Sequence, residues 1–260
     1  MLSVVIPSYK DPLLHNTIDS LLDNSEGEIE VIPVLDGYWP ERSIREDERI
    51  RILHIGKNGG MRNSINAGVR IAGGEYIMRA DEHCMFAKGF DVEMTSNCKP
   101  NWIMTARRYF LDPVRWEIMD IPPVDYEKLK IRDIGNGAHK FEGRVWKKRT
   151  KERRDRKIDE TMAMQGSMWM MHKSWWEKVI KKLDSKNYGT MYQDSHEMVF
   201  KTWKAGGKLV VNKNTWFAHK HVSFPRTHHY SRSEWESGVN YAYKTWSKYY
   251  NEEIRKKWKV

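Results

Sequence analysis

The stretch GGEYIMRADEHC, residues 73–84, joins a glycine pair, an apolar run and a cluster of metal-ligand residue types. The glycines are typical of a helix end, and residues 75–81 have the pattern of a strand. That strand ends at Asp81, which Glu82 and His83 follow. Carboxylate and imidazole side chains directly after a buried strand are typical of a ligand site at the carboxyl edge of a sheet. The stretch therefore predicts an α/β sheet with a site at this strand end.

The segments before this stretch alternate between strand-like and helical patterns. Residues 2–9, 28–37 and 49–56 form apolar runs of strand length, whereas residues 11–24 and 60–73 repeat apolar side chains at helical spacing. Strands and helices in this alternation predict an α/β fold with a mostly parallel central sheet flanked by helices.

The rest of the chain is less regular. Residues 121–133 begin with a proline turn and are short and polar. The elements expected elsewhere are a strand and turn at 101–112, a strand at 168–171 leading into a helix, a helix at 195–207, a short strand at 208–212, and aromatic residues at roughly helical spacing in the tail 233–260.

Composition and charge narrow the range of partners. The chain has 260 residues, of which 40% are hydrophobic, enough for one large α/β domain or two small ones. A formal net charge of +10 and a pI near 9.4 favour an anionic partner. Nucleic acid, an anionic lipid surface and a phosphorylated small molecule all meet that description.

Cysteine content and hydropathy indicate a location. Cys84 and Cys98 are the only cysteines and form no disulfide framework, so a reducing compartment is expected. The sequence opens on a strand-like run rather than a secretory signal. No stretch approaches the roughly 20 apolar residues of a membrane span. The cytoplasm is therefore the expected location, or the host cytoplasm if the protein is viral.

Further motifs follow the other expected strands. Pro7-Ser8-Tyr9 follows the first strand, Asp36-Gly37 follows the second, and the segment 58–63, NGGMRN, opens a helix. In order and content these motifs resemble family 2 glycosyltransferases of the GT-A fold, whose pattern is strand–PxY, strand–DG, NxGxxxARNxG and GEYIxxxDxD. The resemblance covers residues 1–90 well. It departs at His83, and the Asp-x-His-Cys form resembles the related polypeptide N-acetylgalactosaminyltransferases.

The second half carries a matching segment. Residues 192–221, YQDSHEMVFKTWKAGGKLVVNKNTWFAHKH, resemble the carboxylate-rich segment, helix, glycine pair, strand and metal-binding histidine of the same group. The resemblance implies three regions. They are a nucleotide-sugar-binding half at 1–95, an acceptor-binding and catalytic half at 96–225 with a basic loop at 147–157, and an aromatic-basic helical tail at 226–260.

The resemblance also implies a metal site. Asp81, His83 and His219 would hold Mn²⁺ or Mg²⁺ beneath the diphosphate of a nucleotide-sugar donor, with UDP the usual nucleotide of the family. Imidazole with carboxylate suits Mn²⁺ but is compatible with Zn²⁺ or Fe²⁺. His221, two residues beyond His219, is an alternative ligand.

Asp194 falls at the acidic active-site position of the family. As a general base it would take the proton of an acceptor hydroxyl, so the anomeric configuration would invert. Glu197 is an alternative base, and a helix cap is an alternative role for Asp194. The likeness to the N-acetylgalactosaminyltransferases favours retention instead, but the family 2 pattern of the first 90 residues leads us to expect inversion.

Donor contacts are expected from several motifs. Tyr9 would stack on the base, Asp36 would accept hydrogen bonds from it, and Arg62 at a helix N-terminus would meet the phosphates. Core packing is the alternative role for the methionine-rich segment 162–171. The full set of expected donor contacts is Pro7, Ser8, Tyr9, Asp36, Asn58, Gly59, Arg62, Asn63, Arg79, Gln165, Gly166 and Trp169.

The acceptor is suggested by charge. The run KKRTKERRDRK, residues 147–157, has eight basic and two acidic residues. With FPRTHHYSR (224–232) and the basic tail it predicts a positive surface near the active site that would contact phosphates, although such runs are often solvated loops. The favoured acceptor is a hydroxymethylated pyrimidine in DNA, as in phage DNA modification, with an extruded base stacked on aromatic side chains. A polysaccharide, lipid or protein acceptor is the alternative.

Other classes of protein fit the sequence less well. A non-catalytic nucleic-acid-binding protein on the same scaffold is disfavoured by the complete set of Asp81, His83, His219 and Asp194. A nucleotidyltransferase needs a glycine-rich loop with Lys or Arg directly after the first strand. The segment there, SYKDP (residues 8–12), contains no glycine. A dinucleotide-dependent oxidoreductase needs the motif G-x-G-x-x-G after the first strand, and the sequence has no such motif there.

Overall fold

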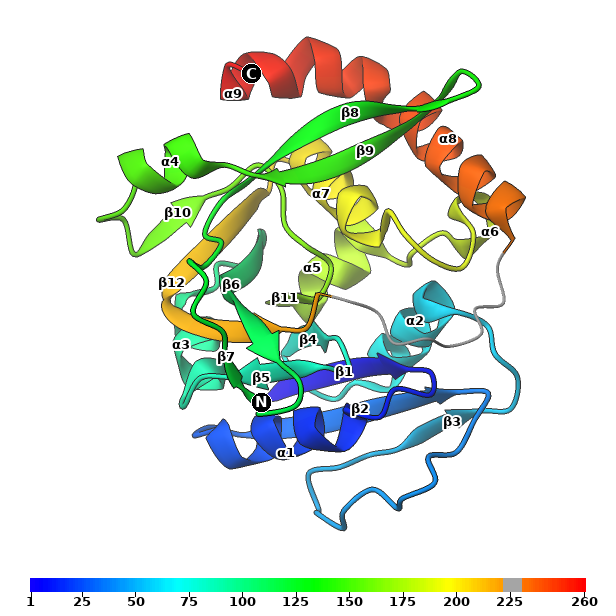
Figure 1. Ribbon diagram of the computed structural model, residues 1–260, viewed down its shortest axis with the longest axis vertical. Coiled ribbons are helices and arrows are strands. Elements are labelled where there is room, and N and C mark those ends of the chain that lie inside the picture. Colours follow the sequence, from blue (N-terminus) through cyan, green and yellow to red (C-terminus); the bar gives the residue numbers. More distant parts are fainter. Residues whose placement is uncertain (222–230) are drawn as a thin grey trace.

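A computed structural model describes residues 1–221 and 231–260 (Figure 1). Its centre is a large mixed sheet in the order β10-β12-β6-β11-β4-β1-β2-β3, in which β5 also pairs with β12 and β7 with β6. These strands are β1 (Leu2–Ser8), β2 (Ile29–Asp36), β3 (Leu53–Ile55), β4 (Tyr76–Ala80), β5 (Cys84–Phe86), β6 (Trp102–Asp112), β7 (Glu117–Ile118), β10 (Ile158–Glu160), β11 (Met168–His172) and β12 (Lys208–His219).

Helices cover both faces of the sheet. They are α1 (Leu14–Asn24), α2 (Met61–Ile71), α3 (Phe90–Asn97), α4 (Lys147–Glu152), α5 (Lys173–Trp175), α6 (Ser185–Tyr188), α7 (Asp194–Lys204), α8 (Arg232–Tyr249) and α9 (Arg255–Trp258), with π-helical turns η1 (Trp176–Ile180) and η2 (Tyr250–Ile254). Within the described residues, no helix combines the length and the apolar character needed to cross a membrane.

The expected α/β class is confirmed, and β1 shows why. All seven residues of β1 are buried. Val4 and Ile6 enter the core that α1 and α3 cover, whereas Val5 enters the opposite core with α2 and α7. A strand buried on both faces reads as a continuous apolar run, which is the pattern seen in the sequence. The strands β4, β1, β2 and β3 are mutually parallel, as are β6 and β12. Between these two groups β11 runs antiparallel to both neighbours.

Several elements differ from the sequence prediction. The third strand is limited to β3, rather than spanning 49–56, and the short strand expected at 208–212 is the twelve-residue β12. A bulge between Asn212 and Trp216 lets β12 continue past its polar segment while staying paired with β6. The basic run 147–157 is not merely a loop, because it contains α4.

A separate hairpin was also missed. The strands β8 (Glu127–Gly135) and β9 (Ala138–Val145) pair with each other and lie beneath α8 and α9 at the top of the view (Figure 1). The hairpin is rich in charged residues, so it carries little of the apolar signal that marks a strand. Phe141 contributes its buried ring, which packs edge-on against Phe200 and Tyr250. The predicted segment 224–232 lies outside the described residues apart from its last two positions.

Candidate active site

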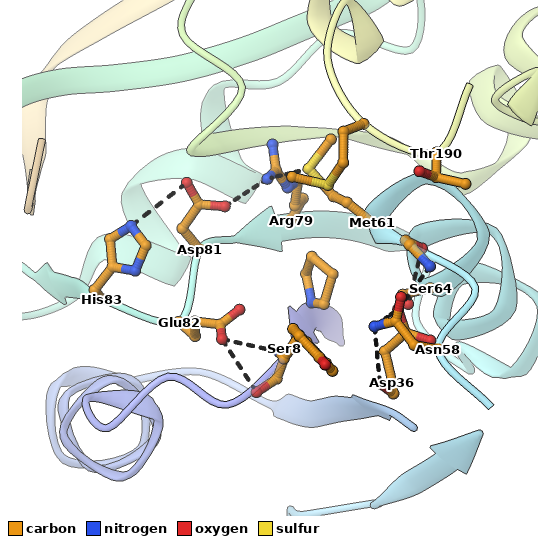
Figure 2. A pocket seen from close by; sticks show the side chains of 14 residues that line it. Ser8, Asp36, Asn58, Met61, Ser64, Arg79, Asp81, Glu82, His83 and Thr190 are labelled. Carbon is orange, nitrogen blue, oxygen red and sulfur yellow. Dashed lines mark hydrogen bonds and ion pairs between the residues drawn. The ribbon is translucent and has the colours of Figure 1, made fainter. Parts of the chain in front are cut away.

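A cavity opens where β1, β2 and β4 end (Figure 2). Because these parallel strands are neighbours, their carboxyl ends meet at one edge of the sheet. The cavity holds about 770 Å³ of empty space, part of it open to solvent. Its lining residues are Pro7, Ser8, Tyr9, Asp36, Asn58, Gly60, Met61, Ser64, Arg79, Asp81, Glu82, His83, Thr190 and Met191.

Asp81, His83 and His219 come together beside this cavity. One ligand atom of each lies within 4.8 Å of those of the other two. His219 Nε2 is 3.2 Å from Asp81 Oδ2, and His83 Nε2 is 4.0 Å from the same oxygen. The antiparallel pairing of β12 with β5 sets His219 opposite Cys84, next to the Asp81–His83 turn. Pairing between distant parts of the chain therefore assembles the group.

His83 is oriented from behind by Asp11. Its Nδ1 lies 2.9 Å from Asp11 Oδ2, which directs Nε2 towards Asp81. A carboxylate behind a ligating imidazole is the usual way to fix its ring and tautomer. Burial lowers the pKa of His83, but the hydrogen bond to Asp11 and the charge of Asp81 outweigh it and leave the pKa raised. Asp11 was not among the predicted site residues, because its position before Pro12 and the helical segment is typical of a helix cap.

His219 has ring nitrogens that suit a ligand. Within residues 1–221 and 231–260, neither nitrogen has a hydrogen-bond partner of acceptable geometry, although both are buried. Burial lowers the pKa of His219 to about 4, so the ring is neutral near pH 7. One carboxylate and two imidazoles are a donor set that a divalent transition ion accepts. The residues present therefore fit a metal such as Mn²⁺.

His221, the alternative ligand, has other partners. Its Nε2 contacts the guanidinium of Arg108, and its Nδ1 lies 3.5 Å from the amide nitrogen of Gln165. Burial, with the charge of Arg108, lowers the pKa of His221 to about 4. It is not part of the group formed by Asp81, His83 and His219.

Arg79 is buried between two carboxylates. Its Nη2 lies 2.5 Å from Asp81 Oδ1, and its Nη1 lies 3.2 Å from Asp194 Oδ2 (Figure 2 shows the first pair). Nη1 also donates to the backbone oxygen of Gly166. Burial raises the pKa of Asp81, but the charge of Arg79 and the contact with His219 hold it well below its ordinary value. The guanidinium thus links Asp81 to Asp194.

Asp194 and Glu197 have different surroundings. Asp194 is the buried first residue of α7 and faces Arg79, whereas Gln193 occupies the N-cap position. A side chain at Gly166 would come within 3.0 Å of its Oδ2, so this glycine leaves room for the carboxylate. Glu197, one turn later, is paired with Arg62 and with Lys201 at 2.6 Å. Of these two carboxylates, only Asp194 is connected through Arg79 to Asp81 and its neighbours His83 and His219.

Asp36 organises the turn before α2. Its Oδ1 accepts the backbone N–H of Gly59 at 2.8 Å, and its Oδ2 accepts that of Gly60 at 2.7 Å. Asn58 donates its amide to Oδ2 at 3.1 Å. These bonds hold the turn against the end of β2, and the cavity lies beside it.

Glu82 is a lining residue that the sequence reading left without a role. Its Oε1 accepts the backbone N–H of Tyr9 at 2.9 Å and lies 3.4 Å from the hydroxyl of Ser8. The pair of bonds joins the ends of β1 and β4 across the cavity floor (Figure 2). Its place between Asp81 and His83 was the signal that could have identified it.

Some expected donor contacts lie away from the cavity. Arg62 is fully buried, donates to the backbone oxygen of Tyr192, and holds its guanidinium 4.5 Å from the ring centre of Tyr188. Asn63 bonds Gly59 and Ser185 through its amide. Trp169 is fully buried and stacks on Trp176, which is the core-packing role that the sequence left open. The expected residues that do not line the cavity are Gly59, Arg62, Asn63, Gln165, Gly166 and Trp169.

The sequence of this chain is similar to those of known glycosyltransferases. A model of the family described as "Glycosyl transferase family 2" matches residues 3–180. The uncharacterized glycosyltransferase EpsJ of Bacillus subtilis is 32% identical over 109 residues, which are 39% of this chain and 31% of EpsJ. Glycosyltransferase GlyG of Streptococcus pneumoniae serotype 4 is 32% identical over 88 residues, 31% of this chain and 29% of GlyG. The matches thus span about a third of each relative.

Solved structures are similar in fold. The crystal structure of GalNAc-T7 with UDP, GalNAc and Mn²⁺ superposes with a TM-score of 0.73 at 14% identity, covering 98% of this chain and 50% of that one. The crystal structure of TarS from S. aureus gives a TM-score of 0.55 at 10% identity. The superposition covers 84% of this chain and 36% of the TarS chain. Likeness at this level of identity shows a shared fold.

Proposed function

The chain belongs to glycosyl transferase family 2, and from this membership we propose that it transfers a hexose or pentose from a nucleotide-sugar to an acceptor hydroxyl with a bound divalent ion. The family match and the GT-A-like structural neighbours confirm the resemblance predicted from the strand-end motifs. The observation that carries the proposal is the grouping of Asp81, His83 and His219 beside the cavity.

Mn²⁺ and a UDP-sugar are the proposed cofactor and donor, with Mg²⁺ as the alternative ion. A divalent ion at this group would neutralise charge on the departing diphosphate. Support comes from the mixed carboxylate and imidazole donor set and from GalNAc-T7, the structure of similar fold that holds UDP, GalNAc and Mn²⁺.

The proposed donor contacts are the expected residues that line the cavity. Tyr9 would stack on the base and Asp36 would accept hydrogen bonds from it, since each oxygen of a carboxylate accepts more than one donor. Glu82 joins them as a new contact. Arg62, Asn63 and Trp169 are left out because their side chains already have partners inside the protein.

Asp194 is the proposed general base, and the proposed outcome is inversion at the anomeric carbon. It would take the proton of the acceptor hydroxyl while Arg79 holds its Oδ2 in position. Proton NMR of the anomeric centre of the first product tests this. A retained configuration would remove Asp194 from the role of base.

For the acceptor we propose a hydroxymethylated pyrimidine in DNA. Support comes from the net charge of +10, although no residue of the basic run 147–157 lines the donor cavity. Transfer of label from a UDP-sugar to DNA with and without hydroxymethylpyrimidines tests this choice. Transfer to a polysaccharide, lipid or protein in its place would contradict it.

The first experiment is calorimetric titration of UDP, with GDP and CDP as controls, into the protein with Mn²⁺ and with EDTA. We expect binding of UDP that needs the metal and is lost in Asp81→Asn, because the amide keeps the size of the side chain but not its charge. Absence of nucleotide binding with every metal tested would overturn the proposal and favour a non-catalytic role on the same scaffold.

A further inference from the structure

A second concavity lies between β8, α4 and the C-terminal helices, which come together at the top of Figure 1. It contains about 1090 Å³ of empty space, part of it open to solvent, and it shares no residue with the donor cavity. We call it the basic groove, because the charged side chains that line it are all cationic: Lys128, Lys130, Lys148, Arg255 and Lys259.

These cations are poorly neutralised. Across residues 1–221 and 231–260, no carboxylate lies within 4.0 Å of the ammonium groups of Lys128, Lys130 or Lys259. Lys148 pairs with Glu152 at 3.8 Å, but both side chains are mostly exposed, so solvent screens the pair. Arg255 is the exception, because its Nε lies 3.0 Å from an oxygen of Val260, the last residue of the sequence, whose terminal carboxylate also lines the groove.

Some of the nearby basic residues outside the groove are paired with carboxylates. On β9, Glu142 pairs with Arg132, Lys140 and Arg144 at distances of 2.6 to 3.2 Å. In the basic run, Arg149 pairs with Asp159 at 3.1 Å. Positive charge in this region therefore comes from the lysines of the groove together with exposed lysines of the basic run, such as Lys151 and Lys157.

The shape of the groove selects among anions. A membrane surface is flat and does not enter a concave site, whereas a flexible chain of phosphates does. The wall includes Trp146, a half-buried ring that packs near Trp258. Cations along a groove with an aromatic wall are the pattern of proteins that bind single-stranded nucleic acid. We propose that the basic groove binds the phosphate backbone of a single-stranded nucleic acid.

The groove is connected to the candidate active site through β8. Glu127, which begins β8, pairs with Arg108 at 2.9 Å, and Arg108 contacts His221, two residues from His219. The next residue, Lys128, lines the groove. We extend the proposal to an acceptor track, in which the bound nucleic acid would run from the groove along β8 towards Asp81, His83 and His219. This role as an acceptor track rests on the proposed function, whereas binding itself does not.

Fluorescence anisotropy of a labelled oligothymidylate with the full chain tests the proposal, in EDTA and without nucleotide-sugar. Binding should weaken with salt, with a slope of log K against log salt of about −3, because each contacted phosphate of a single strand contributes about −0.7. The test variant is Lys128→Gln/Lys130→Gln. We expect a several-fold weaker affinity and a slope smaller in magnitude by about 1.4.

The matched control is Lys151→Gln/Lys157→Gln, which removes the same charge from exposed residues outside the groove. It should bind almost as wild type does. Equal losses in both variants would mean attraction by net charge alone and would overturn the proposal. So would no oligonucleotide binding, or binding to phosphatidylglycerol vesicles in its place. Since UDP calorimetry does not involve the groove, failure here and failure of the proposed function are separable.

Discussion

Arg79 connects two parts of the candidate site: the group of Asp81, His83 and His219, and the carboxylate of Asp194. It is buried and pairs with both Asp81 and Asp194. Replacing it with methionine leaves two poorly solvated carboxylates without their cation, so we expect a loss of about 3 kcal/mol in the free energy of unfolding. Urea denaturation measures this loss.

The same variant tests the metal group. Mn²⁺ should restore more stability to Arg79→Met than it adds to wild type, because the ion supplies positive charge to Asp81. Arg79→Lys, which keeps the charge, serves as control and should lie between the two. An equal gain from Mn²⁺ in all three proteins would contradict the grouping of Asp81 with metal ligands.

Substitutions of Asp194 and Glu197, which lie one turn apart on α7, should have different effects. Asp194→Asn should lower kcat by about 100-fold or more while UDP affinity stays near wild type, as expected for loss of a general base. Glu197→Gln should instead lower stability, because it leaves the buried Arg62 without its carboxylate. Steady-state kinetics and urea denaturation on the two variants distinguish them. A reversed pattern would assign the base to Glu197.

At the scale of elements, α2 lies close to the sheet because of Gly68. A methyl group there would come within 2.4 Å of Val5 Cγ1 and 3.0 Å of Val34 Cγ2. Gly68→Ala should therefore cost about 1–3 kcal/mol of stability by overpacking. Because the turn at Asp36 leads into α2, UDP affinity should fall as well.

Gly56→Ala is the matched control for this prediction. An added methyl group at Gly56 would meet no atom within 4 Å, so urea denaturation and UDP titration should both stay near wild type. If the two variants proved equally stable, the close contact of α2 with β1 and β2 would be wrong.

At the scale of the whole molecule, the C-terminal segment belongs to the main core. One hydrophobic cluster contains Val5 from β1, Phe141 from the hairpin and Trp258 from α9. Trp258 also holds the guanidinium of Arg149 5.0 Å from its ring centre. Trp258→Ala should lower stability by about 3 kcal/mol and keep a single unfolding transition, followed by far-UV circular dichroism. Two separate transitions in wild type would show that the tail folds on its own.

Features that depend on a local pattern of residues could be predicted from the sequence alone. Continuous apolar runs marked the strands buried on both faces, as in β1, and each of these was followed by its polar motif. The positions of Asp36 and Asp81 at strand ends follow from this, because neighbouring parallel strands end at the same edge. Spacing also selected Asp194 and His219 through the family resemblance.

The roles of these side chains depend on the tertiary structure, because their partners come from distant parts of the chain. The pairing of β12 with β5 brings His219, and not His221, together with Asp81 and His83. Contacts made across the core turn Arg62 inward to Glu197 and place Arg79 between two acids. The charged β8–β9 hairpin is a strand pair because α8 and the core cover one face of it, and no local pattern encodes that cover.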